Sequence, residues 1–167
     1  MTSRSTIAKR LDKLGIDLTR TLHRPVGKYQ NVVEVDSLLY VAGHGPFLDG
    51  APAYRGRVPS EVSLQMAFDA ARLTGINCLA TISDYLGDLD GVAGFVKVFG
   101  MVNADPDFTD HPRVLDGASE LLMEVFGDAG IHARSAVGMG SLPFGIPVEI
   151  EMIVRLYPAR HTPKATE

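Results

Sequence analysis

Apolar residues recur along this chain with two different periods, which predict its helices and its strands. Spacings of three and four residues run over 60–87 and 114–126, and they predict two helices with an apolar stripe. A shorter stripe over 3–14, capped by Ser3 or Ser5, predicts a helix near the N-terminal end. Short runs rich in apolar and β-branched residues predict five strands, at 29–35, 38–42, 92–102, 132–139 and 148–156.

The order of these elements predicts the class of fold. A helix, two strands, a long helix, a strand, a helix and two strands form an α+β pattern with a mixed or mainly antiparallel sheet. A strand with one wet face alternates apolar and polar residues, but 38–42, 95–102 and 136–139 are apolar or small on both faces. The two main helices can cover one face of this sheet. We therefore expect a second copy of the chain to cover the other face, in a homo-oligomer.

The length of the chain, 167 residues, is enough for one domain with its own core. We divide the sequence into an N-terminal helix with an irregular lead-in (1–26), a main domain (27–158) and a polar tail (159–167).

Charge and hydropathy narrow the expected partners. The formal net charge is −4, whereas a nucleic-acid binder carries a basic patch, so nucleic acid is not expected as a partner. The N-terminal end lacks the apolar stretch of a secretion signal, and no run approaches the roughly 18 apolar residues of a membrane span. The sequence therefore predicts a cytoplasmic protein with no membrane partner.

The motifs of the common enzyme classes are absent from the sequence. It contains no P-loop, no glycine-rich dinucleotide motif and no GxSxG elbow. The five histidines never fall at metal-ligand spacing, and the single cysteine, Cys78, lies in an apolar helical run where a buried small hydrophobe is expected. We accordingly expect neither a metal nor an organic cofactor.

Two charged residues stand in apolar strands near the C-terminal end. Arg134 lies among small residues, where its guanidinium can bind a carboxylate through two hydrogen bonds; locally, an edge-strand arginine that reaches water is the better interpretation. Glu149 shares a strand face with Glu151 and follows Pro147, next to a loop, although both carboxylates can simply face solvent. The short separation between Arg134 and Glu149 fits two adjacent antiparallel strands, which would bring the two side chains together.

Three further candidates lie near the first two strands. Tyr29 offers a phenol to a pocket or is a rim aromatic, and Gly43 offers backbone N–H groups to a ligand or is a turn glycine. His44 can titrate near neutral pH, but a lone loop histidine is more often a hydrogen-bonding surface residue.

These residues together resemble a known family. The run ARSAVGMGSLPFGIPVEIEMIV, at 133–154, is similar to the C-terminal signature of the RidA/YjgF family. The AGHGP turn after the second strand and the helix and strand over 75–102 also resemble that family, so the likeness extends over 27–155.

The resemblance implies a chorismate-mutase-like α+β fold, assembled as a homotrimer with ligand clefts between subunits. It also implies hydrolysis of 2-enamine and 2-imine intermediates, of the 2-aminoacrylate type, to 2-keto acids and ammonia. By motif position, Arg134 corresponds to the arginine that holds the substrate carboxylate, and Glu149 to the glutamate near the attacking water. Tyr29 corresponds to the pocket-wall tyrosine and Gly43 to the glycine whose backbone lines the site.

The sequence also departs from the family pattern. Ala42 and His44 stand where common members have a hydroxyl residue and a glutamine, and Ala136 stands in place of a frequent cysteine. Asp116, at an expected loop–helix junction, stands at the family's helix asparagine. The altered AGHGP turn leaves a non-catalytic binder of small 2-keto acids as an alternative to imine hydrolysis. The resemblance adds an endoribonuclease, a label that some members of the family carry, although the acidic charge of the chain argues against it.

Overall fold

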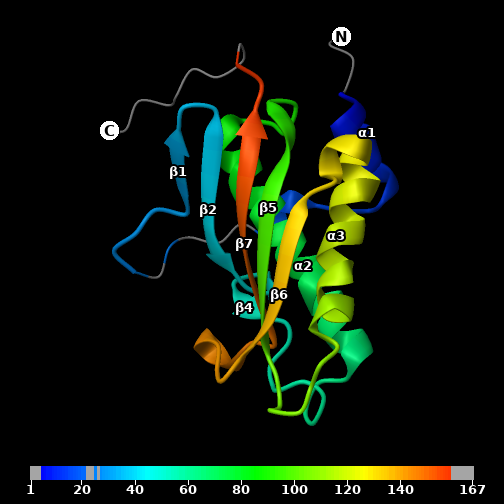
Figure 1. Cartoon of the computed structure of the whole chain (residues 1–167). Coiled ribbons are helices and arrows are strands. Elements are labelled where there is room, and N and C mark those ends of the chain that lie inside the picture. The colour runs from blue at the N-terminus through cyan, green and yellow to red at the C-terminus, as the bar shows by residue number, and fades with distance from the viewer. Residues whose placement is uncertain (1–4, 22–24, 26, 159–167) are drawn as a thin grey trace.

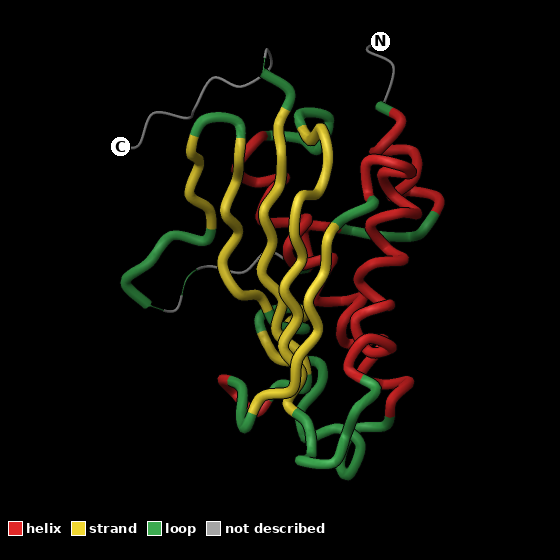
Figure 2. The backbone as a smooth tube through the Cα atoms, in the orientation of Figure 1, coloured by secondary structure: helices red, strands yellow, loops and turns green. Residues whose placement is uncertain are grey.

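A layer of helices packs on one face of a single main sheet in the computed structural model, which describes residues 5–21, 25 and 27–158 (Figures 1 and 2). The sheet has the strand order β1-β2-β7-β5-β6. Its β6 is parallel to β5, and all other neighbours are antiparallel. The strands are β1 (Val32–Val35), β2 (Leu38–His44), β5 (Val92–Asn103), β6 (Ala133–Met139) and β7 (Val148–Leu156). This arrangement confirms the predicted α+β class and the mixed sheet.

The helices are α1 (Thr6–Lys13), α2 (Leu64–Leu86) and α3 (His111–Phe126), with the short 3-10 turns η1 (Leu18–Arg20), η2 (Gly127–Gly130) and η3 (Pro143–Gly145). Helices α2 and α3 lie against each other because α3 carries a glycine at their contact. A Cβ atom at Gly117 would lie 2.1 Å from the backbone oxygen of Phe68, so a larger residue there would push the helices apart. Their apolar stripes and the sheet enclose the hydrophobic core.

Both main helices begin at different residues from those predicted. Helix α2 is capped by Ser63, whose Oγ accepts a hydrogen bond from the backbone N–H of Met66 at 3.2 Å, rather than by Ser60. Helix α3 begins at His111 because its first turn tolerates Pro112, which has no N–H to donate. Asp116 therefore lies inside a helix, and the expected loop–helix junction at this residue was wrong.

The segments around β1 and β2 also differ from the prediction. Strand β1 begins at Val32, so Tyr29 lies in the loop before the strand instead of opening it. A small second sheet of β3 (Phe47–Leu48) and β4 (Ala51–Pro52) follows β2, in a stretch predicted as loop. This small hairpin contacts α2 and brings Phe47 toward that helix.

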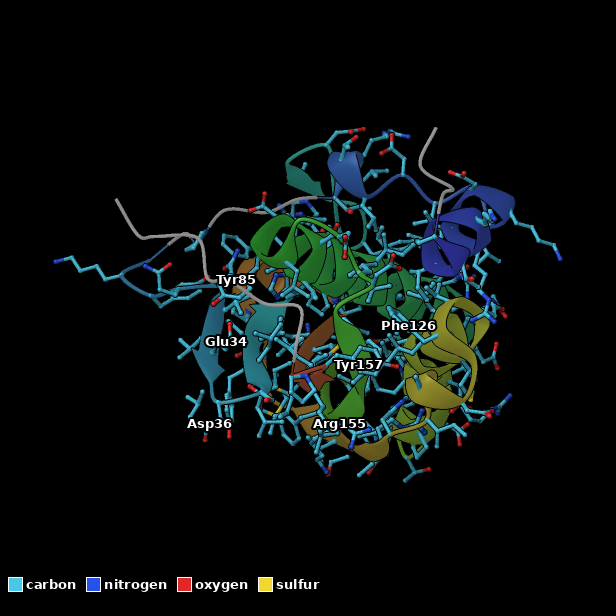
Figure 3. All side chains as sticks on the ribbon, turned by 90° about the horizontal axis from the view of Figure 1, so that it is seen from above. Glu34, Asp36, Tyr85, Phe126, Arg155 and Tyr157 are labelled. Atoms are coloured by element: carbon cyan, nitrogen blue, oxygen red, sulfur yellow. The ribbon has the colours of Figure 1, made fainter. Side chains whose placement is uncertain are left out.

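The opposite face of the sheet is uncovered within one chain. The Oη of Tyr85 on α2 donates to Glu34 at 2.9 Å, so Glu34 faces the helices (Figure 3). Its neighbours Val33 and Val35 therefore point to the opposite face, because side chains alternate along a strand. Val33 and Val35 are 50% and 52% exposed, and Tyr40, opposite Val33, is 45% exposed. The sheet therefore has one covered and one open apolar face, as its strand pattern predicted.

The predicted N-terminal helix is present as α1. Ser5 caps it by accepting a hydrogen bond from Ala8 N–H at 3.1 Å, and Arg10 Nη1 donates to the backbone oxygen of Val125 on α3 at 2.9 Å. Ser3, His23, His161 and the predicted tail 159–167 lie outside the described residues. In the described part of the chain, no helix is both long and apolar enough to cross a membrane.

Candidate functional site

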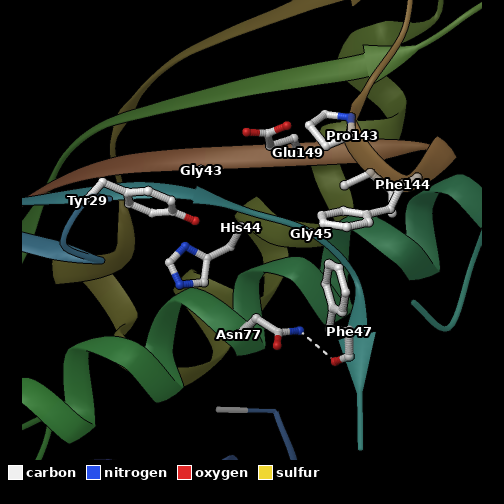
Figure 4. Close-up of a pocket in the computed structure, with 10 residues that line it drawn as sticks. Tyr29, Gly43, His44, Gly45, Phe47, Asn77, Pro143, Phe144 and Glu149 are labelled. Atoms are coloured by element: carbon white, nitrogen blue, oxygen red, sulfur yellow. Dashed lines mark hydrogen bonds between the residues drawn. The ribbon is translucent and has the colours of Figure 1, made fainter. Parts of the chain in front are cut away.

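One pocket of about 190 Å³ brings together four of the six residues singled out from the sequence (Figure 4). Tyr29, Gly43, His44 and Glu149 line it. The other lining residues, which the sequence did not single out, are Gly45, Phe47, Asn77, Pro143, Phe144 and Ile146. The pocket lies where β2 leaves the main sheet, between the loop before β1, the middle of α2 and the loop between β6 and β7.

Glu149 extends over Gly43 of the neighbouring strand. A Cβ atom at Gly43 would lie 2.1 Å from Glu149 Oε1, so only glycine leaves room for the carboxyl group in this position. Glu149 is half-buried, and burial raises the pKa of its carboxyl group; the negative charge of Glu151 on the same strand face adds to the rise. A carboxyl group whose pKa is raised toward neutral is suited to accept and return a proton.

His44 is buried, with 3% of its surface exposed, so the interpretation as a surface residue was wrong. Its Nδ1 lies 2.6 Å from the backbone oxygen of Ala42 and its Nε2 lies 2.8 Å from Thr81 Oγ1. Because a carbonyl oxygen only accepts, Nδ1 carries the proton. Both ring nitrogens are thus engaged by the protein, and His44 forms a wall of the pocket that ties β2 to α2.

Asn77 on α2 forms the floor of the pocket next to His44. Its amide nitrogen donates to the backbone oxygens of Phe47 and Leu73, both at 2.9 Å, and so holds the β3 segment against α2. Its Oδ1 is buried without a hydrogen-bond partner among the described residues. The signal in the sequence was an amide inside the apolar stripe of a helix, where a polar side chain requires partners.

The remaining wall is apolar and comes from two loops. The rings of Phe47 and Phe144 meet edge to face, with centroids 5.7 Å apart, and Pro143 and Ile146 extend this wall. Large apolar side chains within the glycine- and proline-containing runs GHGPF and LPFGIP were the available signal. Their meeting was not predictable, because the runs lie about a hundred positions apart in the sequence (residues 43–47 and 142–147).

Arg134 and Asp116 lie outside this pocket and bind each other. Arg134 Nη1 donates to Asp116 Oδ1 and to Ser119 Oγ, both at 2.9 Å, and Nη2 donates to the backbone oxygen of Pro112 at 3.1 Å. The Ser119 hydroxyl also lies 3.0 Å from Nε2 of His132. Arg134 is therefore anchored to α3 and does not simply extend into water.

The predicted proximity of Arg134 and Glu149 on adjacent antiparallel strands was wrong. The chain passes through α3 between β5 and β6, so β6 returns parallel to β5 at the sheet edge, while β7 lies between β5 and β2. Arg134 points toward α3, and Glu149 points to the face of the sheet that the helices leave open. Within one chain the two side chains lie on opposite faces.

Cys78 supplies no reactive group, and the described histidines form no metal site. Cys78 is fully buried, its Sγ lies near the backbone oxygen of Ile150, and burial raises the pKa of its thiol far above the usual value, as expected of a small core residue. Within residues 5–21, 25 and 27–158, no three His, Cys, Asp or Glu side chains are grouped so that they could hold a metal ion.

The fold and the pocket define an α+β protein with a small ligand site that has a polar edge and an apolar wall and lies next to the open face of the sheet. A family model described as "YjgF/chorismate mutase-like, putative endoribonuclease" matches residues 8–154. The chain therefore belongs to the RidA/YjgF family, as the resemblance of its C-terminal signature indicated. The match begins inside α1, so the family likeness includes part of the N-terminal helix.

Similar proteins extend the comparison across nearly the whole chain. Protein TCP17 of Trypanosoma cruzi is 36% identical over 151 residues, which cover 90% of this chain and 94% of that protein. The structure of Atu1372 from Agrobacterium tumefaciens, a protein of unknown function, is 38% identical with a TM-score of 0.81, covering 90% of this chain and 92% of that one. A Shewanella oneidensis MR-1 structure with the endoribonuclease label is 28% identical with a TM-score of 0.87, covering 91% and 100%.

Proposed function

We propose that this protein hydrolyses 2-imino acids, and the enamines from which they form, to 2-keto acids and ammonia. The observation that carries the proposal is the Glu149 carboxyl group, half-buried over Gly43, with its pKa raised, at the edge of a pocket of metabolite size. A carboxylate in this environment can take a proton from water and return it to a leaving amine near neutral pH. Membership of the RidA/YjgF family, which carries enzyme labels, agrees with an enzymatic role.

The reaction needs no redox step and no cofactor chemistry. Water adds to the imine carbon as Glu149 accepts one of its protons, and a carbon–oxygen bond forms while the carbon–nitrogen double bond becomes single. Glu149 then returns this proton to nitrogen, which gives a carbinolamine with a hydroxyl and an amino group on the same carbon. The same carboxylate transfers the hydroxyl proton to nitrogen, the oxygen forms the carbonyl as the carbon–nitrogen bond breaks, and ammonia leaves. Imines hydrolyse readily in water, so holding the substrate carboxylate and one water molecule in position is sufficient for catalysis.

We propose that the substrate carboxylate binds Arg134 of a neighbouring subunit in a homotrimer. Arg134 uses three of the five guanidinium N–H donors in its bonds to α3, which leaves two for a ligand, and its side chain is 21% exposed at the sheet edge. The open apolar face of the sheet supports an assembly in which a second chain approaches the Glu149 pocket. This arrangement would bring together the two residues that one chain keeps apart.

Ammonia release from freshly generated imines tests the proposal. An amino-acid oxidase produces the imine in the assay, and we expect the wild type to speed hydrolysis well beyond buffer. Arg134→Ala should lower kcat/KM roughly tenfold to hundredfold, the value of a charge-assisted hydrogen bond. Arg134→Lys, which keeps the charge near Asp116 but loses the planar fork, should recover a part of the loss.

Arg113→Ala on the same helix is the matched control, because Arg113 is exposed and pairs only with Asp110 of its own helix in the described residues. It should leave the rate unchanged. A wild type no faster than buffer contradicts imine hydrolysis. If that sample still binds 2-keto acids in a thermal-shift measurement, the pocket serves ligand binding without turnover.

A further inference from the structure

We infer that the pocket selects 2-imino and 2-keto acids with a branched aliphatic or phenyl side chain, and disfavours those with a methyl or a negatively charged one. The inference rests on the proposed function for the orientation of the substrate, and on the lining of the pocket for the side chain that is preferred. Its basis is the division of the pocket into a polar edge, where Glu149 and Gly43 lie, and an apolar end formed by Phe47 and Phe144 (Figure 4).

The orientation of the bound substrate follows from the positions of the polar edge and the apolar end. Water activated by Glu149 must attack the imine carbon, so that carbon lies next to the Glu149 carboxyl group. Tyr29 lies across the pocket from Phe144, and Asn77 forms the floor next to the His44 wall (Figure 4). With the substrate carboxylate directed out of the pocket toward a cation, the remaining substituent on the imine carbon extends toward the two phenylalanine rings.

The size of the pocket suits a side chain of several carbons. Its volume is about 190 Å³. A purely apolar protein cavity of roughly 150 Å³ is enough to bind benzene, so the pocket as a whole has room for a substituent as large as a phenyl or an isobutyl group. A methyl group would leave most of the aromatic wall without contact, and a single methylene in a hydrophobic pocket is worth roughly tenfold in selectivity.

The chemistry of the lining disfavours a negatively charged side chain. Among the described lining residues, Glu149 is the one charged group, and a second carboxylate would lie near its negative charge. The ring nitrogens of His44 and the amide nitrogen of Asn77 already bond to protein oxygens. A negatively charged substituent directed into this end would lose its water without gaining a counter-ion.

Phe144 is held in its position by the backbone of its own loop. It adopts φ +58°, a left-handed conformation that is uncommon for a bulky residue. The Arg55 guanidinium donates to the backbone oxygen of Phe144 at 2.5 Å, and the N–H of Gly56 donates to Gly145 at 2.8 Å. These bonds stabilise an otherwise strained turn whose ring closes the apolar end, so Phe144 is the residue we assign to side-chain selection.

Binding and turnover test the inference separately. By calorimetry we expect 4-methyl-2-oxopentanoate and phenylpyruvate to bind at least tenfold more tightly than pyruvate or 2-oxoglutarate. Phe144→Ala should remove most of that preference and leave pyruvate binding unchanged, and Phe144→Leu should retain a part of it. Met123→Ala, which truncates an exposed apolar residue on α3, is the control and should keep the full preference.

The preference of at least tenfold should also appear in kcat/KM, when imines generated from leucine and phenylalanine are compared with the imine from alanine. Equal binding of all four keto acids, or a preference for pyruvate or 2-oxoglutarate, overturns the inference even if every imine is hydrolysed. A preference for the large apolar keto acids without any turnover supports the inference and contradicts the proposed hydrolysis. A Phe144→Ala variant that keeps the wild-type preference overturns the assignment to Phe144.

Discussion

At the scale of single residues, the carboxyl group of Glu149 has the most unusual environment in the pocket. Burial is the main cause of its raised pKa, and the negative charge of Glu151 is the second, because both favour the protonated carboxyl group. Gly43 makes the burial possible, because any side chain there would occupy the space of the carboxyl oxygen. The position that suits Glu149 to exchange protons therefore also makes its ionised form less stable in the folded protein.

A Glu149→Gln variant should show how much the ionised carboxylate of Glu149 destabilises the folded protein. A carboxyl group with a raised pKa in the folded state contributes stability below its unfolded pKa, and that contribution is lost as the pH rises through the folded value. Glutamine stays neutral, so the variant should gain stability relative to the wild type as the pH rises through this range. The measurement is urea unfolding of both proteins from pH 4 to pH 8. A stability difference that does not change with pH would contradict it.

The activity of the same variant should fall by roughly a hundredfold or more, the usual contribution of a general base. Glu120→Gln, at an exposed position of α3, is the control and should keep the wild-type rate.

The pH dependence of turnover gives a second measurement on Glu149. Glu151→Gln removes the negative charge that contributes to the raised pKa of Glu149, so this pKa should fall. Because the base must be ionised, the acid limb of kcat/KM should move to lower pH in this variant. The part of the rise that comes from burial should remain, so the limb should still lie above that of an exposed carboxyl group. An unchanged limb would exclude Glu149 as the group that titrates.

At the scale of elements, α3 determines how the arginine of β6 is presented. The guanidinium of Arg134 is bonded to Asp116, Ser119 and a backbone oxygen in the first turn of the helix. Asp116 partly compensates the positive charge of Arg134, and its own side chain is 46% exposed, so solvent weakens this effect. The helix thus fixes the orientation of the guanidinium and lowers its attraction for an anion at the same time.

Asp116→Asn should separate these two effects. The amide oxygen can still accept the hydrogen bond from Arg134, but the negative charge is lost, so KM for an anionic substrate should fall roughly twofold to fivefold at an unchanged kcat. Asp116→Ala, which also removes the acceptor, should instead raise KM. Asp110→Asn removes a charge from an exposed pair with Arg113 on the same helix and should change neither constant. A higher KM in Asp116→Asn would contradict charge compensation.

At the scale of the whole molecule, the main exposed apolar surface is the open face of the sheet. Val33, Val35 and Tyr40 expose about half of their side chains there, and Val137 and Met139 of β6 continue the apolar area. Exposed apolar areas of this kind are typical of surfaces that associate. The Glu149 side chain lies on the same face, so association through this surface would also enclose the pocket.

Light scattering after size exclusion should therefore give a mass near three chains of 18.0 kDa. Val137→Asp places a charge in the proposed interface, where its burial is unfavourable, and should yield monomers with little activity. Met123→Asp changes a residue of similar exposure on α3, away from the open face, and should remain a trimer. A monomeric wild type would contradict both the trimer and a cleft shared between subunits.

Much of the fold and part of the pocket could be predicted because their signals are local. The periods of apolar residues located three helices and five strands to within a few residues, and the C-terminal signature pointed to Glu149 and its family. Gly43 and Tyr29 were found in the same way. The apolar end was missed, because Phe47, Asn77 and Phe144 belong to three distant segments and none carries a motif of its own.

The sequence by itself determined the elements, the two-sided apolar character of the strands and the family, since each depends on neighbouring residues. The tertiary structure decided which strands are neighbours. Because β7 pairs with β2 and β5, and β6 returns parallel through α3, Arg134 and Glu149 lie on opposite faces of the sheet. That order results from hydrogen bonding and core packing between segments far apart in the chain, which no local pattern records.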